Sequence, residues 1–221
     1  MRNKFDGVLF DFDGTIADTS RGIYNGFDYA RRELGYRELT REELSTVIGP
    51  PLFGSFKAFY QVDDAAAHEL VAKYREYYSE TGIFESEMYK GIDKLFADLK
   101  AAGVKIGVAT AKPQKFTEKA LKKLGVDKYL DTLVGPDFNN ISDSKVEIIK
   151  KALQNINTSP ERTCMVGDKR YDIEGAKSIK ITGVGVLYGF GSREELENAN
   201  ADYIVSDVDS LYEYLLGDSH K

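Results

Sequence analysis

The chain has 221 residues, of which 42% are hydrophobic and 30% are charged, a composition that suits one globular core with a smaller insertion. Its formal net charge of -6 arises from interspersed acidic and basic residues, and because no basic stripe is present, we expect no nucleic-acid partner. The single cysteine excludes an internal disulfide, and no apolar run approaches the roughly 20 residues of a membrane helix, so the sequence predicts a cytoplasmic protein without a membrane partner.

Short apolar segments typical of strands recur along the chain and alternate with segments of helical period. We expect strands at residues 8–10, 104–109, 132–134, 163–166, 184–187 and 203–205. The helical period is clear at Ile92, Leu95, Phe96 and Leu99. This alternation predicts an α/β fold with a mostly parallel sheet that helices cover on both faces. Such sheets bind ligands at the carboxyl ends of their strands.

Residues 17–88 interrupt the alternation, because they show helical patterns and no convincing strand. They predict an all-helical insertion after the first strand. Since the chain leaves and re-enters beside the end of that strand, we expect the insertion to lie over a site there as a lid that excludes water and selects ligands. The alternative is that its helices only pack on the sheet.

Two carboxylates follow the first expected strand. Asp11 and Asp13 lie two positions apart, and the period of a strand points such side chains in the same direction. Gly14 then permits a sharp turn, and Thr15 supplies a hydroxyl. An Asx turn that closes a strand is the ordinary explanation for Asp13, but it leaves Asp11 unexplained.

A second acidic pair follows the expected strand at 163–166. Asp168 and Asp172 lie four positions apart, so they share a face if a helix begins here. For Asp172 alone, a favourable interaction with the helix dipole is an equally good explanation. Four carboxylates at adjacent strand ends would repel one another without a cation. Because a ligand set made only of oxygen suits Mg²⁺, which commonly binds phosphate as well, the pairs together predict a magnesium site and a phosphorylated substrate.

Two further residues fit this prediction. Thr110 ends the strand expected at 104–109 and can present its hydroxyl and backbone N–H groups to a phosphoryl oxygen. Lys145 opens a helix expected at 144–154, where a cation is unfavourable to the helix dipole unless its side chain turns inward to the carboxylates. Taken singly, Thr110 is explained as a structural residue and Lys145 as a solvated surface lysine.

The four elements DFDGT (11–15), Thr110, Lys145 and GDKRYD (167–172) resemble, in order and spacing, the four motifs of the haloacid dehalogenase superfamily. The similarity is to phosphatases related to phosphoglycolate phosphatase and 5'-nucleotidase, and it covers essentially the whole chain. It implies a Rossmann-like three-layer core of residues 1–16 and 89–221 and a helical cap of residues 17–88.

The resemblance also implies the role of each site residue. Asp11 is expected to be the nucleophile that forms an aspartyl-phosphate, and Asp13 the acid and base that protonates the leaving oxygen and then activates water. Thr110 and Lys145 are expected to contact the phosphoryl group. The expected ligands of Mg²⁺ are Asp11, the backbone carbonyl of Asp13, and Asp168, with Asp172 reaching the ion through water. The expected partner is a small phosphate ester, and a monomer or a homodimer fits equally well.

Several alternatives stay open at this point. A sugar-phosphate mutase of the same fold keeps both aspartates, whereas dehalogenases and phosphonatases lack the second one. The segment Cys164–Arg170 has the C-x5-R spacing of cysteine-dependent phosphatases. A protein that binds phosphorylated metabolites without turnover would also keep these residues. Within the insertion, the stiff turn Gly49-Pro50-Pro51 leads to Phe53 and Phe56, which either contact the leaving group or pack between helices.

Overall fold

The computed structural model describes residues 3–137 and 144–217. The chain divides into two compact units, which we call the core unit (Met1–Asp18 and Met88–Lys221) and the helical unit (Thr19–Glu87). None of the helices within the described ranges is long and apolar enough to cross a membrane.

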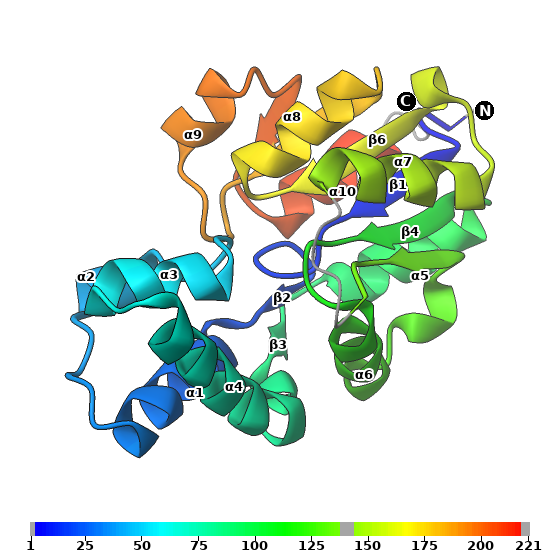
Figure 1. Cartoon of the computed structure of the whole chain (residues 1–221). Coiled ribbons are helices and arrows are strands. Elements are labelled where there is room, and N and C mark those ends of the chain that lie inside the picture. The colour runs from blue at the N-terminus through cyan, green and yellow to red at the C-terminus, as the bar shows by residue number, and fades with distance from the viewer. Residues whose placement is uncertain (1–2, 138–143, 218–221) are drawn as a thin grey trace. The chain divides into compact units, whose positions relative to one another are not determined.

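The core unit is built on a parallel sheet of six strands (Figure 1). In the order β5-β4-β1-β6-β7-β8, all neighbouring strands run parallel. The strands are β1 (Gly7–Phe10), β4 (Lys105–Ala109), β5 (Thr132–Val134), β6 (Thr163–Gly167), β7 (Thr182–Val186) and β8 (Tyr203–Val205). All six expected strands are confirmed: β5 and β8 have the expected bounds, and the ends of the other four differ by at most two residues. Because β1 lies between β4 and β6, the strand order reverses beside it, and this is where such sheets bind ligands.

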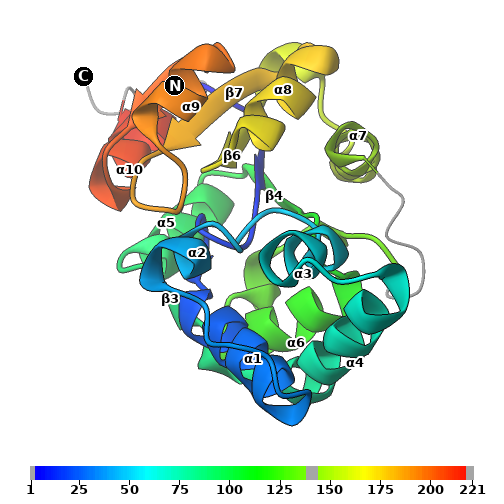
Figure 2. The ribbon, with the colours of Figure 1, turned by 60° about the vertical axis from the view of Figure 1, so that its left-hand side comes forward.

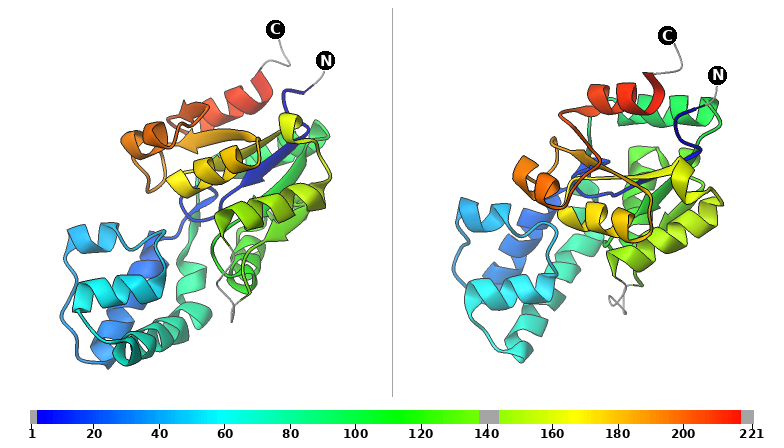
Figure 3. Two further views of the ribbon diagram at one scale, coloured as in Figure 1. Left: turned by 45° about the horizontal axis from the view of Figure 1, so that its top comes forward. Right: turned by 90° about the horizontal axis from the view of Figure 1, so that it is seen from above.

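Helices cover both faces of this sheet, as the α/β prediction requires. They are α5 (Ile92–Ala101), α6 (Gln114–Leu124), α7 (Lys145–Ile156), α8 (Arg170–Ser178), α9 (Arg193–Asn198) and α10 (Val208–Leu216), with short 3₁₀ turns at η2 (Asp127–Tyr129) and η3 (Pro160–Arg162). Figure 3 shows α7 and α8 along one face and α5 and α10 along the other.

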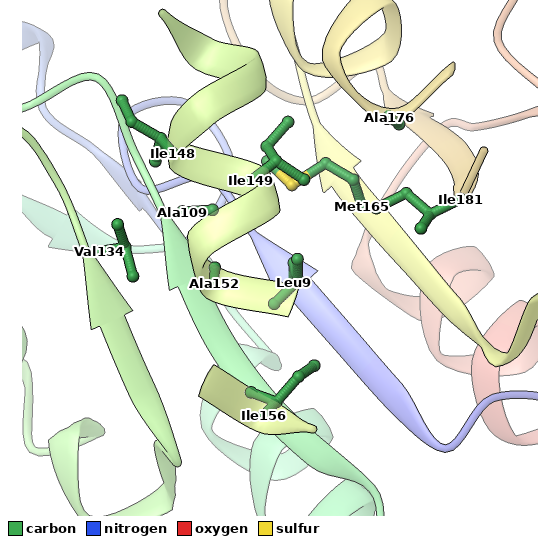
Figure 4. Close-up of a cluster of buried hydrophobic side chains, with 10 residues drawn as sticks. All are labelled: Leu9, Ala109, Val134, Ile148, Ile149, Ala152, Ile156, Met165, Ala176 and Ile181. Carbon is green, nitrogen blue, oxygen red and sulfur yellow. The ribbon is translucent and has the colours of Figure 1, made fainter. Parts of the chain in front are cut away.

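The central strand β1 is buried on both faces, which explains its continuous apolar sequence. On the face covered by α7 and α8, Leu9 joins a buried aliphatic cluster with residues such as Ile149 and Met165 (Figure 4). On the opposite face, the ring of Phe10 lies 4.9 Å from that of Phe96 on α5. Successive side chains of β1 thus pack against the helices on opposite faces of the sheet, and this packing fixes the strand end that Asp11 follows.

The helical unit consists of α1 (Ser20–Glu33), α2 (Arg41–Ser45), α3 (Leu52–Tyr60), α4 (Asp64–Glu80) and a 3₁₀ turn, η1 (Gly82–Glu85). Helix α1 packs along α4 (Figure 2). Gly26 permits this contact, since an added Cβ would lie 2.7 Å from the ring of Tyr74. Phe56 is fully buried, and its ring lies 4.4 Å from that of Phe27. The packing alternative is therefore confirmed for Phe56.

The expectation that residues 17–88 hold no strand is wrong at both ends. Two short strands, β2 (Ala17–Asp18) and β3 (Glu87–Met88), pair with each other where the chain leaves and re-enters the core unit. Each has only two residues, which is too short for an alternating pattern to identify.

Candidate active site

Three of the four predicted carboxylates gather at the carboxyl ends of β1 and β6. Asp11, Asp168 and Asp172, which we call the acid cluster, each offer an oxygen within 4.8 Å of the others. The sheet register explains the meeting, because Phe10 pairs with Val166 and the Asp11 backbone N–H donates to the Val166 carbonyl at 2.9 Å. The two strands thus end at the same level.

The prediction that the two acidic residues after β6 share a face of one helix is wrong. Helix α8 begins at Arg170, so Asp168 precedes it, and the turn between them brings the two carboxylates together. Asp172 has both of the roles considered for it. One of its oxygens accepts a hydrogen bond from the Lys169 backbone N–H at 3.1 Å, which caps the helix, and the other lies in the acid cluster 2.7 Å from the Nζ of Lys145.

Lys145, the first residue of α7, turns inward to the acid cluster. Its Nζ lies 2.9 Å from Asp11 Oδ1 and 2.7 Å from Asp172 Oδ1. Burial favours the neutral amine, but the two carboxylates outweigh it and raise the pKa of Lys145. The alternative of a solvated surface lysine is therefore wrong.

The acid cluster holds three buried carboxylates, and Lys145 is the cation that contacts two of them, so its negative charge is not fully balanced. Asp168 and Asp172 are 0% and 1% exposed. Burial, followed by the neighbouring charges of Asp172 and Asp11, raises the pKa of Asp168 to about 8. Burial also raises the pKa of Asp172, although Lys145 opposes this effect. Since all three ligands offer hard carboxylate oxygens, the cluster fits a divalent cation such as Mg²⁺.

Asp13 lies apart from the acid cluster. Its carboxylate forms an ion pair with Lys112, whose Nζ lies 2.8 and 3.2 Å from the two oxygens. The strand period does not set the direction of Asp13, because β1 ends at Phe10 and the chain then turns; that Asp11 and Asp13 face one ligand stays a prediction. The Phe12 carbonyl accepts hydrogen bonds from the backbone N–H groups of Ile16 and Ala17, and this turn sets the direction of Asp13.

Lys112 was missed by the sequence analysis. Its side chain is only 7% exposed, and its backbone N–H donates to the Thr110 hydroxyl at 3.2 Å. The signal available in the sequence was a lysine two positions after a strand-ending threonine, which alone does not distinguish a buried cation from a surface one. Burial of this lysine beside Asp13 is what marks it as a site residue.

Thr110 is buried at the end of β4, as expected for a site residue. Its own backbone N–H donates to the Val134 carbonyl at 3.0 Å, so the sheet uses that group and the prediction that it faces a ligand is wrong. The hydroxyl, which accepts from the Lys112 N–H, keeps its proton for another acceptor.

The glycine-rich loop after β7 supports Asp168, a role that the sequence analysis did not identify. The Phe190 backbone N–H donates to Asp168 Oδ2 at 2.8 Å. A Cβ added to Gly189 would lie 2.2 Å from the Gly14 carbonyl oxygen, and one added to Gly191 would lie 1.7 Å from the Asp168 carbonyl oxygen. Only glycine permits this approach, so the loop fixes the acid cluster from outside β6.

The turn after β1 connects both groups of charged residues. The Thr15 hydroxyl contacts Asp168 Oδ1 at 3.4 Å, while the Thr15 carbonyl accepts a hydrogen bond from the Tyr188 hydroxyl at 3.1 Å. The Tyr188 ring in turn meets that of Tyr89 edge-on, with centroids 4.8 Å apart. Tyr188 therefore holds the segment that carries Asp13 against the loop that supports Asp168.

Cys164 cannot serve as the nucleophile that its spacing to Arg170 suggested. It is fully buried within β6, and this burial raises the pKa of its thiol. Arg170 contacts Glu174 and Tyr171 on the surface of α8. Because a cysteine-dependent phosphatase needs an accessible thiolate beside its arginine, the structure contradicts this alternative.

Comparison with known proteins shows where this arrangement recurs. The family described as haloacid dehalogenase-like hydrolase matches residues 8–186. The chain is 32% identical to a 5'-nucleotidase from Pseudomonas aeruginosa, over 96% of both chains. It is 30% identical to pyrophosphatase PpaX from Bacillus mycoides, over 94% of this chain and 95% of that protein. A crystal structure from Clostridium difficile, described as a candidate phosphatase, is 38% identical with a TM-score of 0.90 and covers 98% of this chain and 100% of its own.

Proposed function

The chain belongs to the haloacid dehalogenase-like hydrolase family and is a phosphatase, and from this premise we propose that it is a Mg²⁺-dependent phosphomonoesterase that forms an aspartyl-phosphate on Asp11. The observation that carries the proposal is the acid cluster with Lys145 in contact with two of its members. A buried group of carboxylates with one lysine is suited to hold a divalent cation and, through it, an anionic substrate.

Residues of the core unit would hold the ion. The proposed ligands are the carboxylates of Asp11 and Asp168 and the backbone carbonyl of Asp13, with Asp172 reaching the ion through water. A bound Mg²⁺ would neutralise charge on the phosphoryl oxygens. Lys145 adds a second positive charge beside Asp11, which lets an anionic carboxylate approach an anionic ester.

The chemistry divides between Asp11 and Asp13. An Asp11 carboxylate oxygen attacks phosphorus while the bond to the leaving oxygen breaks; that oxygen keeps the electron pair and takes a proton from Asp13. Water then attacks the aspartyl-phosphate as Asp13 accepts its proton, so that inorganic phosphate leaves and Asp11 is restored. The Thr110 hydroxyl donates to a phosphoryl oxygen during both steps.

We propose small phosphorylated metabolites as substrates, of the phosphoglycolate or nucleoside 5'-monophosphate type. The relatives named 5'-nucleotidase and pyrophosphatase support a small phosphorylated substrate, and their names indicate different substrates. Residues 17–88 are proposed as the cap that selects among these substrates. Within it Phe53 packs against His68, with centroids 4.7 Å apart. If Phe53 also contacts the leaving group, Phe53→Ala changes the ratio of kcat/KM values between substrates, and equal ratios would discard that contact.

Phosphate release from an aryl phosphate tests the proposal most directly. We expect turnover with Mg²⁺, loss of turnover on chelation, and loss in Asp11→Asn. Asp93→Asn, an exposed aspartate on α5, is the matched control and should behave as the wild type. Mass spectrometry of acid-quenched wild type should find one phosphoryl group on Asp11. Turnover by Asp11→Asn, or activity without any divalent ion, would refute the mechanism, and conversion of a sugar phosphate into its isomer without phosphate release would favour the mutase.

A further inference from the structure

The structure contains a buried lysine that the proposed mechanism does not use. Lys145 contacts the acid cluster, whereas Lys112 pairs with Asp13, the residue proposed to give its proton to the leaving oxygen. Asp13 must carry a proton when it gives one to the leaving oxygen, so at that moment its charge no longer balances the buried ammonium of Lys112, and a negative charge on the leaving group can take its place. Resting on the proposed function, we infer that Lys112 binds a negative charge on the leaving group and makes the enzyme selective for esters that carry one.

The distances suit this role. Lys112 Nζ lies 2.8 and 3.2 Å from the two Asp13 oxygens. A leaving oxygen that takes a proton from Asp13 lies about 2.7 Å from one of those oxygens, so it comes within about 6 Å of the ammonium. A carboxylate one carbon away from the leaving oxygen, or the second phosphoryl group of a pyrophosphate, spans that interval. A neutral alcohol brings no charge to meet it.

The lysine is also held in place before any substrate binds. Its N–H donates to the Thr110 hydroxyl, and Pro113 follows directly and precedes α6. On the other side, a Cβ added to Gly135 would lie 2.5 Å from the Lys112 carbonyl oxygen, so the loop after β5 packs tightly on this residue. Ordering a long side chain in advance reduces the entropy that binding would otherwise cost.

The charge beside Asp13 therefore distinguishes two substrate classes. Esters with an anionic leaving group gain an attractive contact with Lys112, and this contact remains as the leaving oxygen separates from phosphorus. Esters of neutral alcohols gain none. The shared chemistry is an anion close to the scissile bond, either a carboxylate as in phosphoglycolate or a phosphoryl group as in pyrophosphate.

Matched substrates test the inference. Phosphoglycolate and 2-hydroxyethyl phosphate have the same two-carbon skeleton and differ in whether a carboxylate or a hydroxyl ends it, while pyrophosphate tests the phosphoryl source. We expect wild type to prefer an anionic substrate. Lys112→Met should lower kcat/KM for that substrate about tenfold more than for 2-hydroxyethyl phosphate, as loss of one charge-assisted contact predicts. Lys112→Arg should restore much of the preference. Lys115→Met, which removes an exposed charge from α6, should leave it unchanged.

The outcomes separate the two proposals. A wild type that hydrolyses neutral and anionic esters equally well, or a Lys112→Met variant that loses the same factor with both, overturns the role of Lys112 and leaves the phosphatase mechanism intact. A wild type that hydrolyses none of these esters and no aryl phosphate overturns both. Selectivity for phosphoglycolate alone or for pyrophosphate alone identifies the carboxylate or the phosphoryl group as the anion. If Lys112→Met does not fold, the wild-type preference and its retention in Lys112→Arg still decide the question.

Discussion

The acid cluster and the Asp13–Lys112 pair each contain an aspartate that follows β1, but they differ in how their charges are balanced. In the acid cluster, Lys145 contacts two of the three carboxylates, and burial of the third, Asp168, raises its pKa to about 8. In the pair, one carboxylate meets one ammonium, and the Asp13 side chain is 22% exposed. The first region therefore has an excess of buried negative charge that fits a cation, whereas the charges of the second region balance each other. Asp11 and Asp13 are two positions apart in the sequence, yet their neighbours give them different electrostatic surroundings.

The largest effect should come from removing the lysine of the acid cluster. Lys145→Met leaves Asp11 and Asp172 buried beside each other without their cation, so we expect kcat/KM to fall on the order of a hundredfold or more. The metal-free protein should lose about 3–5 kcal/mol of unfolding free energy in urea titrations. Lys150→Met, on the exposed side of α7, is the control and should change neither quantity by much. Wild-type turnover in Lys145→Met would mean that the acid cluster needs no second cation.

A substitution in the supporting loop should distort the acid cluster while leaving the Asp13–Lys112 pair in place. Gly191→Ala places a Cβ 1.7 Å from the Asp168 carbonyl oxygen, so the loop or Asp168 must move. We expect a loss of about 1–3 kcal/mol in stability and weaker Mg²⁺ binding by calorimetry. Gly54→Ala on α3 has open space around the added methyl group and should be neutral. Unchanged Mg²⁺ affinity in Gly191→Ala would show that the loop does not position Asp168.

The pKa of Asp168 predicts how pH and metal act on the acid cluster. An ordinary aspartate titrates near 3.8, and Asp168 titrates near 8 in the folded, metal-free protein. Between these values the folded state binds more protons than the unfolded state, so this residue makes metal-free stability fall as pH rises from about 4 to 8. Urea titrations with chelator at several pH values should show a smaller fall in Asp168→Asn, with Asp93→Asn as the control.

Metal binding gives the second half of this prediction. A pKa of about 8 predicts that Mg²⁺ displaces a proton from Asp168 at pH 7, so we expect binding to release close to one proton, measurable by calorimetry in buffers of different ionisation enthalpy. The released fraction should decline above pH 8. Binding without proton release at pH 7 would mean that the acid cluster is already ionised and that its charge is compensated in another way.

The smallest effect is expected where both regions are connected. Tyr188→Phe removes the hydrogen bond to the Thr15 carbonyl, which should cost about 0.5–1.5 kcal/mol of stability. Because Thr15 follows Asp13 and its hydroxyl contacts Asp168, kcat and Mg²⁺ affinity should both weaken slightly. Tyr203→Phe, at an exposed ring on β8, provides the comparison. If only kcat or only Mg²⁺ affinity falls, the turn after β1 supports only one of the two regions, the Asp13–Lys112 pair or the acid cluster.

The sequence alone was sufficient for the order of strands and helices and for the three residues that gather in the acid cluster. Short apolar runs and the 3.6-residue period of helices are local properties of the sequence, so six strands and the helices between them could be predicted. Asp11, Asp168 and Asp172 could be paired in advance because parallel strands bring their carboxyl ends to one edge of the sheet. Two-residue strands such as Ala17–Asp18 were too short to leave a pattern.

Only the tertiary structure decided which charges meet. β1 ends at Phe10 and β6 ends at Gly167, so turns rather than the strand pleat set where the next side chains point. Asp13 consequently pairs with Lys112. Lys145, at the start of α7, contacts the acid cluster from a distant part of the chain. Burial of Lys112 and the approach of Gly191 to Asp168 depend on segments far apart in the chain, which no local period encodes. Local periodicity thus determined where the strands end, while long-range packing determined which charges lie together there.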